Sequence, residues 1–342
     1  ENYSVLKKEL EQRGHEFLSE TDTEVLVHLI GDIHKNGKQS LFDSVRLALN
    51  EVIGAYAIVV ISDDNPDELI AARKSSPLVV GLGQGEYFCA SDATPIIEYT
   101  KNVVYLEDGE IAHISLKNGL KLKTIGNQNK TPYIQELEMH LEALEKGGYE
   151  HFMLKEIYEQ PQSILDSMRG RFSISQGKVA LGGILDYEEK LINAKRLIFV
   201  ACGTSWHAGL VGEYLFEEIA RIPVEVEYAS EFRYRNPIIN ENDVVIAISQ
   251  SGETADTLAA IKLAKERKAT LIGVCNVVGS SISRETHCGS YTHAGPEIGV
   301  ASTKAFTAQV TILTLMAMMI GRRKGTITNE RFNRLLVELN AI

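Results

Sequence analysis

The sequence has few cysteines, and the four that it has, among 342 residues, form no CxxC pair. Single scattered cysteines argue against a disulfide framework or a structural zinc site, and they suit a reducing compartment. Basic residues are also in the minority: 35 Lys and Arg stand against 46 Asp and Glu, for a net charge of −11. No apolar run reaches the ~18 residues of a membrane span. We therefore predict a cytoplasmic protein without a metal, a nucleic acid or a membrane as partner.

The standard nucleotide-binding loops are missing as well. Neither GxGxxG nor GxxxxGK[ST] occurs in the chain. The glycine-rich segment 81–85 lies between two predicted strands with no helix after it, so we interpret it as a hairpin. The sequence thus predicts no cofactor.

Helices and strands are mixed in the first third of the chain. Apolar residues recur at helical spacing over 2–12, 25–33 and 41–49. Five β-rich runs separated by turn signals follow, at 55–61, 68–72, 78–83, 87–91 and 102–106. This order predicts an α+β domain with an antiparallel sheet. The polar composition of 117–148, which includes an acidic helical stretch, predicts an interdomain connection.

The last part of the chain has a different pattern. Three apolar strands at 197–201, 244–248 and 271–275 alternate with segments of helical length. They lack polar alternation, as strands of a doubly covered parallel sheet do. A later helix, 301–320, is apolar nearly all round. We expect a second domain or a dimer partner to cover it, and the chain alone to self-associate.

The segment SQSGET, at 249–254, directly follows the second of these strands. Its polar residues Ser249, Gln250, Ser251 and Thr254 stand where a helix begins. A helix N-terminus offers unpaired N–H groups to an anion, and small hydroxyl residues let it approach closely. The alternative is an N-cap, formed by Ser251 or Thr254.

Two other loops have the same character. Thr204 and Ser205 follow the strand at 197–201, and the loop with Val300 and Ser302 precedes the long apolar helix. The ends of parallel strands meet at one edge of a sheet, so these loops can face one ligand. Cys202 is better explained as a small buried apolar residue than as a nucleophile. The segment 19–24 precedes a helix and is by itself a capping sequence.

Eight segments together carry a family resemblance. They are SETDTEV (19–25), GAYA (54–57), SPLVVGLG (76–83), KEIYEQP (155–161), CGTS (202–205), ASEFRYR (229–235), SQSGETADT (249–257) and EIGVASTKAFT (297–307). With them the chain resembles the glutamine–fructose-6-phosphate aminotransferases, or glucosamine-6-phosphate synthases. This family converts fructose 6-phosphate and glutamine to glucosamine 6-phosphate and glutamate, the first step of amino-sugar synthesis.

The resemblance implies an α/β architecture in three segments. Residues 1–118 would be the rear of an N-terminal-nucleophile α+β glutaminase domain. Residues 119–185 would be a connection with helices, and residues 186–342 the first sugar-isomerase (SIS) domain, with a doubly wound parallel sheet. The resemblance also implies a homodimer.

The resemblance assigns roles to nine residues. Asp22 would hold the α-amino group of glutamine. The residues implied in phosphosugar binding are Thr204, Ser205, Ser249, Gln250, Ser251 and Thr254, with Val300 and Ser302 lining the sugar.

The chain departs from the family at both ends. Glu1 stands first, whereas the family nucleophile is a cysteine whose own α-amine serves as the base. The sequence stops after one SIS domain, and the family's remaining catalytic groups belong to the second. We therefore expect an internal fragment that contains no catalytic residue and is inactive alone.

Two other functions fit the phosphate-binding turns. One is a non-catalytic SIS-type sugar-phosphate sensor, which would have no use for Asp22. The other is a simple phosphosugar isomerase, for which Glu297 is the acidic residue available as a base in the ligand loops.

Overall fold

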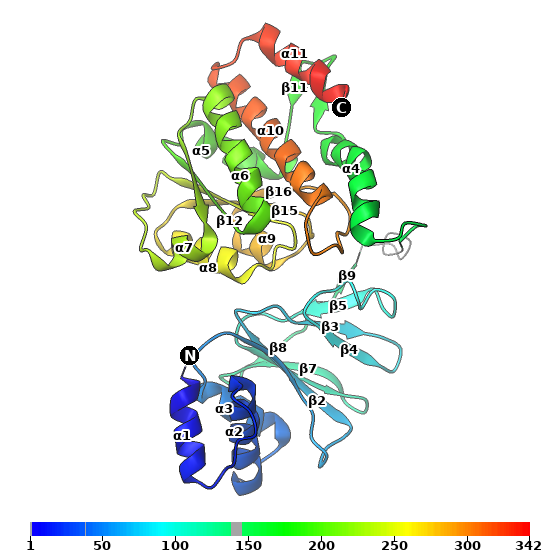
Figure 1. Cartoon of the computed structure of the whole chain (residues 1–342), viewed down its shortest axis with the longest axis vertical. Helices are drawn as coiled ribbons and strands as arrows, with labels where there is room; N and C mark the ends of the chain where they lie inside the picture. Colours follow the sequence, from blue (N-terminus) through cyan, green and yellow to red (C-terminus); the bar gives the residue numbers. More distant parts are fainter. Residues whose placement is uncertain (1, 38, 138–145) are drawn as a thin grey trace. The chain divides into compact units, whose positions relative to one another are not determined.

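A computed structural model describes residues 2–37, 39–137 and 146–342. It divides into two compact units, Glu1–Leu141 and Glu142–Ile342, and each is described by itself (Figure 1). The segment 19–25 falls in the first unit, and the hydroxyl-rich turns at 203–205 and 249–254 fall in the second. The predicted boundaries at 118 and 185 stay a prediction.

The first unit opens with three helices and continues with strands. The helices are α1 (Tyr3–Gln12), α2 (Asp22–Gly37) and α3 (Leu41–Glu51). The strands are β1 (Tyr56–Val60), β2 (Glu68–Lys74), β3 (Val79–Leu82), β4 (Tyr87–Ala90), β5 (Asn102–Tyr105), β6 (Glu110–Ser115), β7 (Gly119–Thr124), β8 (Asn129–Lys130) and β9 (Gln135–Glu136). The three helices and five of these strands lie where the sequence predicts them.

Two antiparallel sheets pack face to face, and the helices cover the outer face of the first sheet. The first has the order β1-β2-β6-β7-β8 and the second β4-β3-β5-β9. The unit has one core between the helices and the first sheet and another between the two sheets. Successive residues of β2 point into different cores: Ile70 and Ala72 pack with the helices, whereas Ala71 packs toward the second sheet. Side chains alternate between the faces of a strand, so one strand serves both cores. The predicted antiparallel α+β architecture is confirmed.

The strand pairing tests two further expectations. Leu82 pairs with Tyr87 across the turn between β3 and β4, which confirms the hairpin at 81–85. β6 and β7, which were not predicted, form a hairpin in which Ser115 pairs with Gly119. The first sheet therefore continues into the stretch predicted as a connection. The acidic helical stretch predicted there falls mainly on residues 138–145, which lie outside the described residues.

The second unit has eight named helices among the described residues. They are α4 (Phe152–Met168), α5 (Glu188–Ile192), α6 (Gly203–Leu215), α7 (Ala229–Tyr234), α8 (Ala255–Glu266), α9 (Ser281–Glu285), α10 (Lys304–Lys324) and α11 (Asn329–Asn340), with short turns η2 (Gly182–Tyr187) and η3 (Phe216–Ala220). The strands are β10 (Phe172–Ser173), β11 (Lys178–Val179), β12 (Leu197–Ala201), β13 (Val224–Tyr228), β14 (Val244–Ser249), β15 (Thr270–Cys275) and β16 (Cys288–Tyr291).

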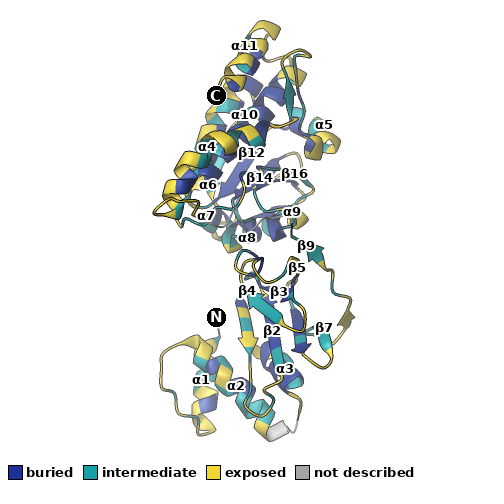
Figure 2. Ribbon diagram, turned by 90° about the vertical axis from the view of Figure 1, so that its right-hand side faces the viewer, coloured by how far each residue is buried: buried dark blue, intermediate teal, exposed yellow. Residues whose placement is uncertain are grey.

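A five-stranded parallel sheet forms the centre of this unit. Its order is β13-β12-β14-β15-β16, and every neighbouring pair is parallel. In β12, Phe199 packs into one core and Val200 into the other. Both faces are thus covered, and Figure 2 shows β12 and β14 as buried strands. The predicted doubly wound parallel sheet is confirmed.

The long helix α10 is covered within its own unit. It packs against α4, α6 and η3, and 14 of its 21 residues are buried. Among the described residues it is the one helix long and apolar enough to cross a membrane, and 78% of its apolar window is buried. The prediction that α10 needs another domain or a partner for cover is therefore wrong, and its apolar character gives no reason to expect self-association.

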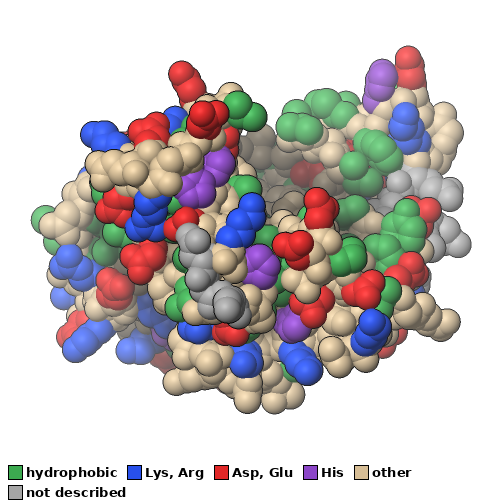
Figure 3. Space-filling model, turned by 90° about the horizontal axis from the view of Figure 1, so that it is seen from below, with side chains coloured by type: hydrophobic (Ala, Val, Ile, Leu, Met, Phe, Trp, Pro, Cys, Tyr) green, Lys and Arg blue, Asp and Glu red, His purple; other side chains and the backbone are tan. Residues whose placement is uncertain are grey.

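The charged side chains of the described residues are mixed in sign on the face drawn in Figure 3. Acidic and basic groups are interspersed there. Neighbouring charges of opposite sign partly cancel one another on this face, whereas the chain as a whole carries a net charge of −11.

Candidate functional site

Two turns lie at neighbouring strand ends of the parallel sheet. β12 and β14 are adjacent and in register, with Val200 paired to Ala247. A helix begins shortly after each strand, α6 at Gly203 and α8 at Ala255. The Cys202 sulfur lies 3.9 Å from the Thr257 hydroxyl oxygen, so the first turn touches the helix that follows the second. Both helix N-termini therefore lie at one edge of the sheet.

The turn at 249–254 is held by its own hydroxyl groups. Ser249 Oγ accepts a hydrogen bond of 3.0 Å from the Gly252 N–H, and it lies 3.0 Å from Thr254 Oγ1. Ser251 Oγ accepts from the Glu253 N–H at 3.1 Å. Thr254 takes the N-cap position of α8, yet its side chain caps no N–H of that helix. Three of the predicted residues are thus brought together, and the first N–H groups of α8 lack a side-chain cap.

Gly252 allows this turn to approach its neighbour closely. Its φ is +67°, and a Cβ atom here would lie 1.9 Å from Ser280 Oγ. The Ile282 N–H donates to the Gly252 carbonyl at 2.9 Å, and the Ser281 N–H donates to the Glu253 carboxylate at 2.7 Å. The turn is therefore fixed against the start of α9.

The turn at 203–205 presents one exposed and one buried hydroxyl. Thr204 is exposed, and Ser205 is buried. The Gln309 side-chain amide of α10 donates to Ser205 Oγ at 3.0 Å. Cys202, the N-cap residue of α6, makes no side-chain cap, so the first N–H groups of α6 are also left without one.

The third predicted loop precedes α10. Val300 is fully exposed and Ser302 is half-buried. No hydrogen bond within the described ranges joins either residue to the two turns. Glu297 Oε1 accepts from the Thr303 and Ala305 N–H groups, at 2.8 and 3.1 Å, and so caps α10. This role counts against Glu297 as the base of a simple isomerase.

Asn276, which was not predicted as a site residue, connects the turn at 249–254 with the segment that leads to the third loop. Its N–H donates to the Gln250 carbonyl at 3.2 Å. Its side chain accepts from Thr292 Oγ1 and donates to the Gly295 carbonyl, at 2.8 and 2.6 Å. Asn276 directly follows β15, the third apolar strand, and this position was the signal that could have identified it.

Glu156 of α4 was also missed. Its Oε1 accepts from the N–H groups of Ile298 and Gly299, at 2.6 and 3.0 Å, and the side chain is 2% exposed. A Cβ atom at Gly299 would lie 2.5 Å from Glu156 Oε2. The segment KEIYEQP gave no signal for this contact beyond its family resemblance.

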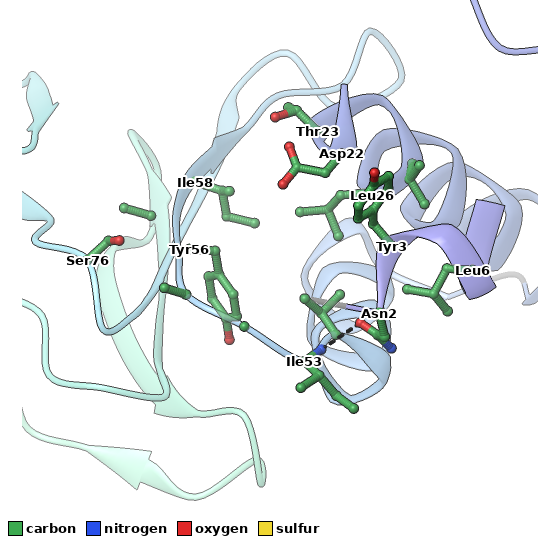
Figure 4. A pocket seen from close by; sticks show the side chains of 15 residues that line it. Asn2, Tyr3, Leu6, Asp22, Thr23, Leu26, Ile53, Tyr56, Ile58 and Ser76 are labelled. Carbon is green, nitrogen blue, oxygen red and sulfur yellow. Dashed lines mark hydrogen bonds between the residues drawn. The ribbon is translucent and has the colours of Figure 1, made fainter. Parts of the chain in front are cut away.

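In the first unit, Asp22 lines a cavity of about 350 Å³. Figure 4 shows Asp22 and Thr23 of α2 at this cavity, with Tyr56 and Ile58 of β1 and Asn2 and Tyr3 of the N-terminal segment. The carboxylate of Asp22, an exposed residue, has no hydrogen-bond or ion-pair partner in the part of the chain that is described. Burial, with the charge of Asp108, raises the pKa of Tyr56 in the same cavity to about 12.

The neighbours of Asp22 do the capping. Glu24 accepts from the N–H groups of Leu18 and Ser19, at 2.7 and 2.6 Å, and from the Ser19 hydroxyl. These bonds, with that from Leu18 the largest cause, lower its pKa to about 2. Thr21 Oγ1 accepts from the Glu24 N–H at 3.4 Å. The capping interpretation of 19–24 thus holds for Thr21 and Glu24, whereas Asp22 faces the cavity.

The arrangement in the second unit suits an anion more than a metal ion. Two helix N-termini and several hydroxyl groups are hydrogen-bond donors for phosphate oxygens. Among the described residues, no cluster of three or more His, Cys, Asp or Glu side chains could hold a metal ion.

Two family models match this chain. A glutamine amidotransferase domain matches residues 1–98, and a SIS domain matches residues 190–319. The chain is 61% identical over 342 residues to a glutamine–fructose-6-phosphate aminotransferase [isomerizing] of Bacteroides thetaiotaomicron. It is 60% identical over 340 residues to the protein of that name from Chlorobaculum tepidum. These matches cover 100% and 99% of this chain but 56% and 55% of the relatives, so the chain spans about half of their length.

One solved structure extends the comparison to the fold. It is the C-terminal domain of a glucosamine-fructose-6-phosphate aminotransferase from Francisella tularensis. The match has a TM-score of 0.54 and 38% identity, and it covers 58% of this chain and 55% of that one.

Proposed function

We propose, from the relationship of this chain along its whole length to glutamine–fructose-6-phosphate aminotransferases, that it forms the phosphosugar-binding part of such an enzyme. The reaction would convert fructose 6-phosphate and glutamine to glucosamine 6-phosphate and glutamate. The observation that carries the proposal is the turn at 249–254, in which Ser249, Thr254 and Gly252 form one hydrogen-bonded group beside an uncapped helix N-terminus.

The phosphate would bind at the sheet edge shared by the two turns. The hydroxyl groups of Ser249, Ser251 and Thr254 would bind it from one side, and those of Thr204 and Ser205 from the other. The N-termini of α6 and α8 add a favourable dipole at the same edge. Gln250, Val300 and Ser302 would contact the sugar. Anchoring of this kind strengthens ground-state binding, and by itself it does not accelerate the chemical step.

Asp22 would bind the α-amino group of glutamine in the first unit. Its carboxylate lines the cavity of about 350 Å³ and has no competing partner among the described residues. A carboxylate and an ammonium group form a charge-assisted hydrogen bond. Asp22→Asn should therefore weaken L-glutamine binding, whereas Asp63→Asn, at an exposed position outside the cavity, should not.

A homodimer and a cytoplasmic location also belong to this proposal. The family resemblance supports the homodimer, and the four free cysteines suit a reducing cytoplasm. Sedimentation of the purified chain over a concentration series measures the state of assembly directly.

Calorimetric titration with fructose 6-phosphate tests the phosphosugar site. A hydrogen bond to a charged group contributes ~1.5–3 kcal/mol, so Ser249→Ala with Ser251→Ala should weaken binding at least about tenfold. The matched control is Ser173→Ala with Ser175→Ala in the β10–β11 hairpin, where the two hydroxyls contact each other. Unchanged affinity in the site variant, or equal losses in both variants, would contradict the proposal.

A further inference from the structure

We propose that Gln309 is a positioning residue of the phosphosugar site and acts through Ser205. This inference rests on the proposed function and adds to it a group that does not itself touch the ligand. Gln309 lies in α10, 104 residues along the chain from Ser205. Its amide nitrogen donates to Ser205 Oγ at 3.0 Å.

The environment of Gln309 makes its polarity unusual. The side chain is 1% exposed and belongs to a helix whose buried residues include Ile312, Leu313 and Met316. A buried amide disfavours folding unless its hydrogen bonds are satisfied. The Gln309 nitrogen is satisfied by Ser205, whereas its oxygen has no partner among the described residues. An apolar side chain at this position would therefore favour the folded state more than the amide does. The amide instead acts on Ser205, the one group to which it is hydrogen-bonded among the described residues.

The direction of the hydrogen bond decides what Ser205 can do. A serine hydroxyl carries one hydrogen and two lone pairs. Because Gln309 donates, it occupies a lone pair and leaves the hydrogen of Ser205 unused. Within the described residues this hydrogen has no acceptor. Donation to Oγ also polarises the O–H bond, which makes the hydroxyl a stronger donor to a phosphate oxygen.

Ser205 lies at the N-terminus of α6. It is the third residue of α6, in the first turn of a helix whose N-cap side chain makes no cap. Its hydroxyl is therefore held beside backbone N–H groups that favour the same anion. Gln309 would orient a donor that is already at the helix N-terminus.

A double-mutant cycle on the 342-residue chain tests this role. The variants are Ser205→Ala, Gln309→Leu and the two combined, each titrated with fructose 6-phosphate by calorimetry. We expect Ser205→Ala and Gln309→Leu each to weaken binding by roughly tenfold, on the scale of one charged hydrogen bond. The combined variant should bind no more weakly than Ser205→Ala alone, because Gln309 has no effect once the hydroxyl is gone.

Two further variants separate positioning from packing. Gln309→Glu keeps the shape but accepts the Ser205 hydrogen, so it should weaken binding at least as much as Ser205→Ala. Thr311→Val is the matched control, because Thr311 is buried in the same helix but donates to the Thr307 carbonyl within it. It should leave affinity unchanged. If Gln309→Leu does not fold, Gln309→Met replaces it in the cycle.

The possible results separate this inference from the function that it rests on. Gln309 variants that bind like the wild type while Ser205→Ala is weakened would overturn the role of Gln309 and leave the phosphosugar site intact. Additive losses in the combined variant would also overturn it, because Gln309 would then act by another route. A wild-type chain that binds no fructose 6-phosphate would instead overturn the proposed function itself.

Discussion

The carboxylate of Glu156 accepts a hydrogen bond of 2.6 Å from the backbone N–H of Ile298, 142 residues further along the chain. The same oxygen accepts from the Gly299 N–H at 3.0 Å. One buried side chain of α4 therefore fixes the start of the loop that carries Val300 and Ser302. Lys304, the first residue of α10, pairs with Glu159 at 2.7 Å and ties the other end of the loop to the same helix.

Glu156→Ala should destabilise the second unit and loosen this loop. The change removes two hydrogen bonds to a charged group, each contributing ~1.5–3 kcal/mol. It also leaves two backbone N–H groups without their acceptor. Urea unfolding should give a lower free energy of unfolding, whereas Glu241→Ala at an exposed position should have little effect. Equal stability of the wild type and Glu156→Ala would show that these contacts contribute nothing.

Gly252→Ala should disrupt the turn at 249–254 for two separable reasons. The new Cβ would meet Ser280 Oγ at 1.9 Å, and alanine would be strained at a φ of +67°. The left-handed conformation alone costs roughly 1–2 kcal/mol. Adding Ser280→Gly to Gly252→Ala removes the clash and keeps the strain, so thermal unfolding should show partial recovery. Full recovery, or none at all, would contradict this division.

Glu24 should stabilise the first unit in a pH-dependent way. Hydrogen bonds from the Leu18 N–H, the Ser19 hydroxyl and the Ser19 N–H lower its pKa from 4.5 to about 2. A lowered folded-state pKa means that the charged form stabilises the fold above pH 4.5, and that this contribution is lost as the pH falls toward 2. The destabilisation caused by Glu24→Gln should therefore be clearly larger at pH 7 than at pH 3. Glu20→Gln, at an exposed position in the same segment, is the control, and an effect of Glu24→Gln that stays constant with pH would refute the assignment.

Three of the four cysteines should react slowly with thiol reagents. Burial raises the pKa of Cys89 to about 11. It is also the largest cause of the raised pKa values of Cys275 and Cys288, both about 12. The thiolate is the reactive form, so its small population at pH 8 should slow labelling by on the order of a hundredfold or more relative to an ordinary thiol. In a Cys202→Ser background, a disulfide reagent should label the folded chain slowly and the urea-unfolded chain rapidly. Fast labelling of the folded chain would contradict the burial of these groups.

The parallel sheet could be predicted where its strands are buried on both faces. β12 is apolar throughout, and β14 and β15 are interrupted by a hydroxyl residue only at one end, Ser249 and Thr270; all three strands were predicted. The two edge strands, β13 and β16, were not predicted. In β13 apolar residues alternate with Glu225 and Glu227, because an edge strand is partly exposed. β16 contains Gly289 and Ser290 and has no aliphatic side chain.

The candidate site was predictable only in part, for a similar reason. Strand ends followed by hydroxyl residues are visible in the sequence, and the structure brings Ser249, Ser251 and Thr254 into one turn. The supporting contacts of Glu156 and Gln309 join residues more than 100 positions apart. Their partners depend on how α4 and α10 pack, and no local pattern encodes that. The ligand roles of all nine residues remain predictions.

The most direct measurement is a crystal structure of this chain grown with fructose 6-phosphate. We predict the phosphate at the carboxyl edge of β12 and β14, within hydrogen-bond distance of Ser249, Ser251 and Thr254 on one side and of the 204–205 turn on the other. The Ser205 hydroxyl should donate to it while accepting from Gln309. A phosphate bound elsewhere in the second unit, or an empty turn at saturating ligand, would contradict the account.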